Sequence, residues 1–422
     1  MEYMEMRKCA RNSLMVLAVC LTAWLPMLTA HSQTLEDTTT CTPPPLPWPQ
    51  NVQVQLDSLM GDPLLTTTHL GLVVYDLTAD SVIFSHDARQ TLRPASTMKL
   101  LTAATALDCL GGSYRFRTGL YYDGEIRENV LVGDVWLVGG MDPLFDDTDM
   151  RAFAESFRRL GVDTIRGRIM ADNTFKEENL LGEGWCWDDD NPQLTSLLIN
   201  GKDEFVDRFM DEVRRGEVYI DAPCAYGSMP KNARLLCSRA HPIDAVLFPM
   251  MKESNNLYAE SLFFQIAAAS GVRPATAAHA RQAVKRFIAK TGFPGAPYRV
   301  ADGSGLSLYN YVTPELMVRL LRYVYHHRDM HMYLLPSLPV AGQDGTLKKR
   351  MTGVATKGNV KAKTGTVTGV SSLAGYCMAY NRHQIAFCII NQGVLKGVDG
   401  RAFQDKVCEA LCRAYPVAMQ IP

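Results

Sequence analysis

The chain has 422 residues, of which 47% are hydrophobic and 21% are charged, so it can bury a sizeable core and is expected to form more than one domain. This composition excludes an intrinsically disordered protein. The formal net charge of −1 provides neither a basic field for nucleic acid nor a polybasic patch for a membrane surface, so we expect neither partner.

Residues 1–32 have the features of a signal peptide. Basic residues precede an apolar run at 13–30, and the small residues Ala30 and Ser32 have the spacing that a signal peptidase reads. We therefore expect export, a periplasmic or otherwise exported location, and no stable membrane span after cleavage. Two alternatives stay open: the run is about the minimum length that spans a bilayer, and Cys20 fits a lipoprotein, although an apolar stretch would then begin the mature chain.

Eleven cysteines include two in this leader, and the remaining nine cannot all pair internally. We interpret them as structural thiols and leave their pairing open. No Cys/His spacing is typical of a metal site. The consecutive acids Asp188, Asp189 and Asp190 are better explained by a solvated turn than by a metal site, so we expect no metal and no cofactor.

The next elements in the chain predict a tether followed by a folded domain. The proline-rich stretch "TCTPPPLPWPQ" indicates an extended tether, which we place at 33–62. Alternation of apolar and polar residues at 69–87 predicts a strand hairpin. From Arg117 to Trp187 short strands and Gly-rich turns surround a helical stretch at 148–160, which predicts an inserted β-rich domain at 117–199.

Residues 63–116 and 200–422 are expected to form the main domain. Apolar residues at spacings of three and four predict helical structure from Pro242 to Gly271. Three strands follow, "VKAKTGTV", "SSLAGYCMAY" and "QIAFCIINQG", and a helix at 401–415 closes the chain. Helices followed by an antiparallel meander and a terminal helix indicate an α+β fold.

Ser96 and Lys99 in "RPASTMKLLTAATAL" lie one helical turn apart, in front of an apolar run. A lysine that is desolvated there loses affinity for its proton and can act as a base for the neighbouring hydroxyl. A chain of this length is expected to contain about one S-x-x-K by chance, and a second occurs at Ser228 and Lys231. That pair lies in a loop-like stretch, so Ser96 is the better candidate nucleophile.

Two further polar motifs stand among apolar residues. Ser254-Asn255-Asn256 is the only S-x-N in the chain, and a helix N-cap is its alternative interpretation. Lys363-Thr364-Gly365 lies on a predicted strand, whose backbone can pair with an extended peptide. The competing Lys290-Thr291-Gly292 follows a helical stretch, and Gly292 is best explained as the residue that ends this helix.

In this order, S-x-x-K, S-x-N and K-T-G resemble the active-site set of the D-alanyl-D-alanine carboxypeptidase/endopeptidase family typified by the low-molecular-mass class C penicillin-binding proteins. The resemblance covers most of the chain from about Leu64 to Gln392. It is carried by the stretches "STMKLLTAATALDCLG", "LVGGMDPLF", "GWCWDDD", "MMKESNNLYAE", "DGSGLSLYNYVTPE", "AGQDGTLKKR" and "VKAKTGTVTGVSSLAGY". It implies a penicillin-binding transpeptidase/β-lactamase-like domain, with an antiparallel sheet flanked by helices, and an inserted β-rich domain.

The resemblance also implies an activity: cleavage of D-Ala-D-Ala or DD-crosslinks in peptidoglycan stem peptides, with covalent acylation by β-lactams. Ser96 would form the acyl-enzyme and Lys99 would take its proton. Ser254 would relay a proton to the leaving amine, and Asn256 would hold Lys99 and the substrate. Lys363 would supply positive potential, and the implied substrate-binding residues are Thr364, Gly365 and Thr366. The oxyanion hole would be formed by the N–H groups of Ser96 and Thr366.

Two features of the sequence qualify this resemblance. The region 188–253 is short for the family, which leaves the walls of the substrate site open, and with them the choice between carboxypeptidase and endopeptidase. Asp302 in "DGSGL" also matches the family and is interpreted as a residue that hydrogen-bonds its own turn. The alternatives are a β-lactamase, or a catalytically silent peptidoglycan-binding module, which would have no reason to keep all five catalytic candidates.

Overall fold

The computed structural model describes residues 46–188, 191–221 and 223–413. The expected signal peptide at 1–32 lies outside the described residues, as do the first part of the expected tether and the acids Asp189 and Asp190. Residues 45–422 make up one compact unit, and the candidate site lies within it.

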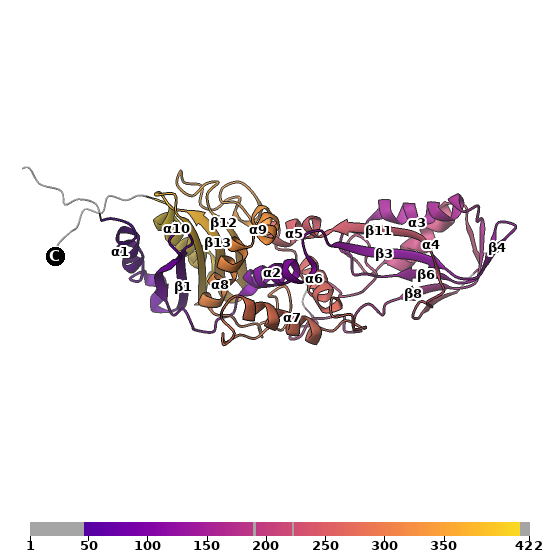
Figure 1. Cartoon of the computed structure of the whole chain (residues 1–422), viewed down its shortest axis with the longest axis horizontal. Coiled ribbons are helices and arrows are strands. Elements are labelled where there is room, and N and C mark those ends of the chain that lie inside the picture. Colours follow the sequence, from indigo (N-terminus) through magenta and orange to yellow (C-terminus); the bar gives the residue numbers. More distant parts are fainter. Residues whose placement is uncertain (1–45, 189–190, 222, 414–422) are drawn as a thin grey trace, which may run out of the picture. The chain divides into compact units, whose positions relative to one another are not determined.

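Five antiparallel strands form the sheet next to the candidate site, in the order β12-β13-β14-β1-β2 (Figure 1). The strands are β1 (His69–Asp76), β2 (Ser81–His86), β12 (Lys361–Val367), β13 (Gly369–Met378) and β14 (Gln384–Val394). The expected hairpin at 69–87 and the three C-terminal strands are thereby confirmed. Strand β12, which carries K-T-G, lies at the edge of the sheet.

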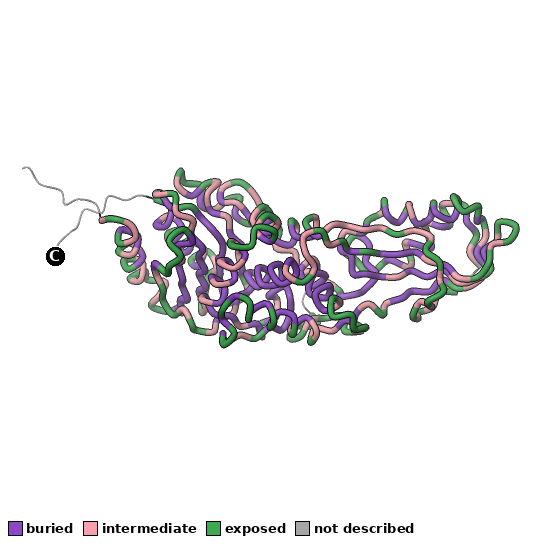
Figure 2. Tube along the Cα trace, viewed as in Figure 1, coloured by how far each residue is buried: buried purple, intermediate pink, exposed green. Residues whose placement is uncertain are grey.

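Helices cover both faces of this sheet, because successive side chains of its strands point to opposite faces. In β1, Leu72 and Val74 pack with helices α1 and α10, whereas Val73 packs with the larger group α2 and α5 to α9. Figure 2 shows the buried residues along these strands and along α2. The helices are α1 (Gln50–Leu59), α2 (Met98–Leu110), α5 (Ile243–Lys252), α6 (Asn256–Ala268), α7 (Ala277–Lys290), α8 (Pro314–His326), α9 (Arg328–Ser337) and α10 (Gly397–Cys412), with short 3-10 helices η1 (Pro63–Thr66), η2 (Ala95–Thr97) and η3 (Gly345–Leu347).

Helix α1 lies within the stretch 33–62 that the sequence predicts to be a tether. Its side chains Val52 and Leu56 are four residues apart, lie on one helix face and are fully buried against the sheet core. The prolines before Gln50 predict an extended segment, whereas the short apolar helix face that follows them packs against the sheet. Part of the stretch expected to be a tether therefore forms a helix packed on the sheet, while the domain boundary at residue 63 stays a prediction.

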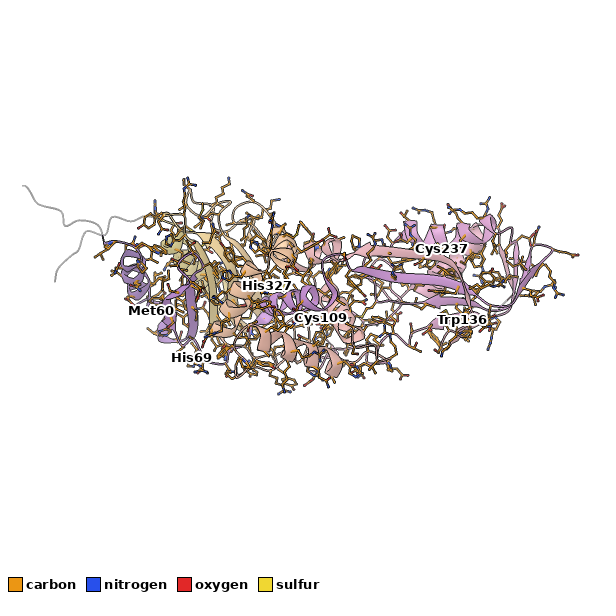
Figure 3. The ribbon with its side chains drawn as sticks, viewed as in Figure 1. Met60, His69, Cys109, Trp136, Cys237 and His327 are labelled. Carbon is orange, nitrogen blue, oxygen red and sulfur yellow. The ribbon has the colours of Figure 1, made fainter. Side chains whose placement is uncertain are left out.

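A second set of strands follows α2 and has its own core. One sheet has the order β10-β8-β6-β3-β11 and a smaller one the order β4-β5-β7-β9, with helices α3 and α4 packed on them. Trp136 on β6 and Cys237 on β11 mark this module in Figure 3. The elements are β3 (Arg115–Tyr122), β4 (Glu125–Arg127), β5 (Val130–Val132), β6 (Val135–Val138), α3 (Asp147–Arg159), β7 (Thr164–Arg166), β8 (Ile169–Asp172), α4 (Phe205–Arg215), β9 (Tyr219–Asp221), β10 (Cys224–Tyr226) and β11 (Arg234–Pro242).

The strand pairing of this module extends past the expected limits of the inserted domain, 117–199. Strand β11 pairs antiparallel with β3 from Arg234 to Pro242, so the module uses residues on both sides of Asn200. The sequence between Trp187 and Ser254, which looks shortened, supplies α4 and three of the module's strands. The division into domains stays a prediction, but the sheet itself ends at Pro242, directly before α5.

None of the described helices is both long enough and apolar enough to cross a bilayer. The eight described cysteines are free thiols, and four of them are buried in the main domain: Cys377, Cys388, Cys408 and Cys412. Cys109, labelled in Figure 3, is exposed at the end of α2. The four buried cysteines are placed as structural thiols would be, whereas Cys109, Cys186 and Cys224 are exposed, and the interpretation stays a prediction for them.

Candidate active site

The S-x-x-K motif lies where η2 leads into α2. Ser96 is half-buried in η2, and Lys99 is in the first turn of α2, with its side chain fully buried. Every residue of α2 from Met98 to Leu107 is buried, so Lys99 cannot reach water along its own helix. Burial of a lysine at this position places its amine beside the Ser96 hydroxyl, at 3.0 Å.

Three oxygen atoms surround the Nζ atom of Lys99. Besides Ser96 Oγ, they are Asn256 Oδ1 at 2.7 Å and the Ser304 carbonyl oxygen at 2.8 Å. The amide and carbonyl oxygens can only accept hydrogen bonds. A neutral amine would donate its two N–H groups to them and point its lone pair at the Ser96 hydroxyl. This is the geometry that a general base for Ser96 requires.

Burial lowers the pKa of Lys99 from 10.5 to about 7, while the nearby carboxyl groups of Asp302 and Glu260 act in the opposite direction. At pH 7 about half of the Lys99 side chains are then neutral, compared with about one in 2,500 for a free lysine. The site therefore supplies most of the free energy that deprotonation of a free lysine would cost.

The S-x-N motif occupies the break between α5 and α6, and its three residues have different tasks. Asn255 is the N-cap of α6, and its side chain accepts a hydrogen bond from the Tyr258 N–H at 3.3 Å. Ser254 has a left-handed backbone (φ 62°), and Asn256 begins the helix. The helix-cap interpretation is therefore right for the middle residue, and the other two are free to turn towards the lysines.

Ser254 contacts the second buried lysine of the site. Lys363 on β12 donates hydrogen bonds to Ser254 Oγ and to the Thr364 carbonyl oxygen, both at 2.8 Å. Burial, and the positive charge of Lys99, lower the pKa of Lys363 well below its usual value. Hydrogen bonds thus join the five candidate catalytic residues into two groups. One consists of Ser96, Lys99 and Asn256, and the other of Ser254 and Lys363.

Gly365 allows the edge strand to approach the Ser96 turn. A Cβ atom at this position would lie 2.8 Å from the Pro94 carbonyl oxygen and 3.0 Å from the Ser96 backbone nitrogen. On either side, Thr364 is half-buried and Thr366 is exposed, at the outer edge of the sheet. The Thr364 hydroxyl donates a hydrogen bond to Thr346 Oγ1 at 2.8 Å. The three implied substrate-binding residues therefore line the strand beside Ser96.

The competing motifs lie away from this site. Ser228 and Lys231 are both exposed. Lys290 pairs with Asp108, and Gly292 has the left-handed backbone (φ 78°) expected at the end of a helix. The described residues contain no group of three or more His, Cys, Asp or Glu side chains arranged to hold a metal ion.

Sequence reasoning missed two contributors to the site, Glu260 and the carbonyl group of Ser304. A backbone carbonyl has no sequence signature. Glu260 did have one, because it is the only acid in the apolar run of α6 and lies four residues after Asn256. The interpretation of Asp302 as a turn residue is confirmed: its carboxylate accepts hydrogen bonds from the N–H groups of Gly305 and Ser307.

Comparisons with known proteins agree with the fold and with the family resemblance. The model of the D-Ala-D-Ala carboxypeptidase 3 (S13) family matches residues 52–196 and 199–413. The D-alanyl-D-alanine carboxypeptidase of Actinomadura sp. (strain R39) is 27% identical in an alignment of 438 positions, gaps included, that covers 80% of each protein.

Two solved structures share the fold. Penicillin binding protein 4 (dacB) from Haemophilus influenzae superposes with a TM-score of 0.77 at 22% identity, over 86% of this chain and 98% of that one. A penicillin G-acylated predatory endopeptidase from Bdellovibrio bacteriovorus, in complex with an immunity protein, gives 0.55 at 18% identity, over 84% and 97%. Because the family model matches most of its length, the chain belongs to the D-Ala-D-Ala carboxypeptidase 3 (S13) family.

Proposed function

We propose that this protein is a serine D-alanyl-D-alanine carboxypeptidase that acts on peptidoglycan stem peptides through an acyl-enzyme on Ser96. One observation carries the proposal: the buried amine of Lys99 lies 3.0 Å from Ser96 Oγ, and its other two neighbours are hydrogen-bond acceptors. This arrangement gives an otherwise inert hydroxyl a base that is partly neutral at physiological pH.

In the acylation step, Lys99 takes the proton of Ser96 while Oγ attacks the carbonyl carbon of the D-Ala-D-Ala bond. The backbone N–H groups of Ser96 and Thr366 would stabilise the oxyanion, and each such donor is worth about 3 kcal/mol of the barrier. Ser254, held by Lys363, passes a proton to the leaving amine. D-Alanine departs, and water then hydrolyses the ester on Ser96.

The substrate is an extended peptide with a free carboxylate, and strand β12 suits both features. As an edge strand it can pair with an extended chain. Lys363 provides positive potential, and the hydroxyl groups of Thr364 and Thr366 would bind the terminal carboxylate. The R39 relative carries the same activity in its name, and the Bdellovibrio protein of this fold is acylated by penicillin G, so β-lactams are expected to acylate Ser96 here as well.

Peptidoglycan lies outside the cytoplasmic membrane, so this function requires export. The signal-peptide features of residues 1–32 supply the route, and we propose a periplasmic or otherwise exported location. Cleavage of DD-crosslinks is the second candidate activity. It uses the same chemistry, and the Bdellovibrio protein of this fold is an endopeptidase.

Release of D-alanine from a stem pentapeptide tests the proposal. We expect release by the wild type and none by Ser96→Ala, and mass spectrometry should find penicillin bound to Ser96. Ser228→Ala is the matched control, because it removes the serine of the exposed S-x-x-K. Peptidoglycan binding without D-alanine release would instead favour a silent module, and rapid penicillin turnover would favour a β-lactamase. Monomers formed from dimeric muropeptides would show crosslink cleavage.

A further inference from the structure

Glu260 is a buried carboxyl group on α6, one helical turn after Asn256. Residues four apart on a helix share a face, so both side chains point towards α2. The side chain of Glu260 is 1% exposed. Its Oε1 atom accepts hydrogen bonds from the N–H groups of Ser304 at 2.8 Å and Gly303 at 3.1 Å, and its Oε2 atom lies 3.2 Å from the Gly303 nitrogen.

These hydrogen bonds fix the loop that faces Lys99. The Ser304 carbonyl oxygen accepts the hydrogen bond from Lys99 Nζ, and the Gly303 carbonyl oxygen accepts one from Thr102 Oγ1 at 2.6 Å. Gly305 lies so close to the turn before Ser96 that a Cβ atom there would be 1.9 Å from the Ala95 carbonyl oxygen. The loop 303–305 is therefore held between Glu260 on one side and α2 on the other.

Helix α6 thus influences both acceptors for the amine of Lys99, although only one of them belongs to it. Asn256 provides one with its own side chain, and Glu260 provides the other by holding the Ser304 carbonyl in place. With both acceptors fixed, the third direction at Nζ points to Ser96. If the Ser304 carbonyl moved, a neutral amine could rotate, and its lone pair would leave the Ser96 hydroxyl.

Burying a carboxyl group to hold a loop costs free energy. Burial and the negative charge of Asp302 raise the pKa of Glu260 to about 8. No basic side chain among the described residues forms a salt bridge with Glu260, which lines a cavity of about 410 Å³ together with phenylalanines and with the charged residues Arg281 and Asp302. An apolar side chain would avoid this cost but would leave the N–H groups of Gly303 and Ser304 without their acceptor, so the need for an acceptor explains a polar residue here better than stability does.

We propose that Glu260 is a positioning residue that aims Lys99 at Ser96 by fixing the Ser304 carbonyl group. The inference rests on the proposed function, because it assigns Lys99 the role of base. According to this inference, the acylation rate depends on where the acceptor oxygen of residue 260 lies and not on the charge of that side chain.

Three substitutions separate position from charge. Glu260→Gln keeps an acceptor at Oε1 but cannot ionise, Glu260→Asp keeps an ionisable carboxyl group and withdraws the acceptor, and Glu260→Leu removes both. The readouts are the limiting rate of acylation by a fluorescent penicillin and the penicillin concentration that gives half of it. We expect Glu260→Gln to stay close to the wild type, and the other two to lose about a hundredfold in limiting rate with an unchanged half-saturating concentration.

Gln265→Leu is the matched control, because it removes another buried polar side chain of α6 that hydrogen-bonds Gly140 and Tyr114 and does not contact Lys99. It should keep the wild-type acylation rate even where its melting temperature falls. An equal loss of rate in Gln265→Leu, a loss in Glu260→Gln as large as that in Glu260→Leu, or a wild-type rate in Glu260→Asp would each overturn the inference.

If Glu260→Leu does not fold, the comparison of Glu260→Asp with Glu260→Gln decides alone. Failure of the proposed function gives a different result, because the wild type itself would then form no penicillin adduct on Ser96.

Discussion

Lys99 and Lys363 are fully buried in one site, and the positive charge of Lys99 adds to burial in lowering the pKa of Lys363. The two amines come from a helix and from an edge strand that are 264 positions apart in the sequence. Because each disfavours a proton on the other, the site favours states in which at least one amine is neutral.

The first prediction concerns the pH dependence of acylation. The pKa of Lys99 lies at about 7, so the neutral base is lost as the pH falls through this value. The rate of acylation by a fluorescent penicillin should therefore rise from pH 5.5 to 8.5 with a midpoint near 7. A rate that is constant over this range would contradict the role of Lys99 as the base.

The second prediction concerns Ser254. Ser254→Ala removes the hydroxyl that Lys363 contacts at 2.8 Å, and with it the proposed route of the proton to the leaving amine. Release of D-alanine should fall by about a hundredfold, as expected for loss of a general acid. Ser261→Ala is the control, because Ser261 is a buried serine of α6 whose hydroxyl has no hydrogen-bond partner within the described part of the chain. Equal rates in the two variants would exclude Ser254 from the proton path.

The third prediction concerns Gly365. In Gly365→Ala the new Cβ would lie 2.2 Å from Ser372 Oγ and 2.8 Å from the Pro94 carbonyl oxygen, so β12 must shift relative to both β13 and the Ser96 turn. Overpacking of this kind costs about 1–3 kcal/mol, and acylation should fall by more than about tenfold. Gly353→Ala, whose Cβ would meet its neighbours no closer than 3.5 Å, should behave like the wild type. Wild-type acylation by Gly365→Ala would show that the close approach is not needed.

The fourth prediction concerns stability and His241, the residue of β11 that joins two acids of the second module. Its Nδ1 atom lies 2.7 Å from Asp142 Oδ2 and its Nε2 atom 3.3 Å from Asp149 Oδ2. The hydrogen bond to Asp142 raises the pKa of His241 above its ordinary value of 6.5, although burial opposes this. The resulting stabilisation is fully present below pH 6.5 and is lost as the pH rises through the folded-state value.

The loss of unfolding free energy in His241→Gln should therefore be larger at pH 6 than at pH 9, as measured by urea denaturation. His86→Gln, which replaces a histidine with a side chain that is 44% exposed, provides the comparison. An equal loss in His241→Gln at both pH values would show that the interaction with the acids does not depend on the imidazolium.

The elements around the site could be predicted from the sequence because each has a local signal. The alternation in "HLGLVVYD" and the β-branched residues around Lys363 predict strands, and both are present. The predicted helix after Pro94 is α2. The motifs carry information beyond these periodic patterns, because Lys99 stands directly before an apolar run, where a charged residue is costly unless it has a partner.

The remaining features depend on contacts between distant segments. Helix α1 could not be predicted from its local sequence, because prolines precede it and its apolar face is buried against α10, some 350 residues later. The pairing of β3 with β11 joins residues more than 100 positions apart, so composition alone does not reveal that this sheet continues to Pro242. The role of Glu260 depends on the loop at 303–305, and no local pattern reveals that contact.

Asn255 has a consequence for how such motifs are varied experimentally. As the variable position of S-x-N, it would be randomised freely in a mutant library, yet its side chain caps α6 and so supports the helix that presents Asn256 and Glu260. Replacing an N-cap asparagine by alanine costs about 1 kcal/mol. Variants selected at this position will therefore differ first in heat tolerance and expression yield, and aspartate, serine and threonine are the substitutions to which selection should return.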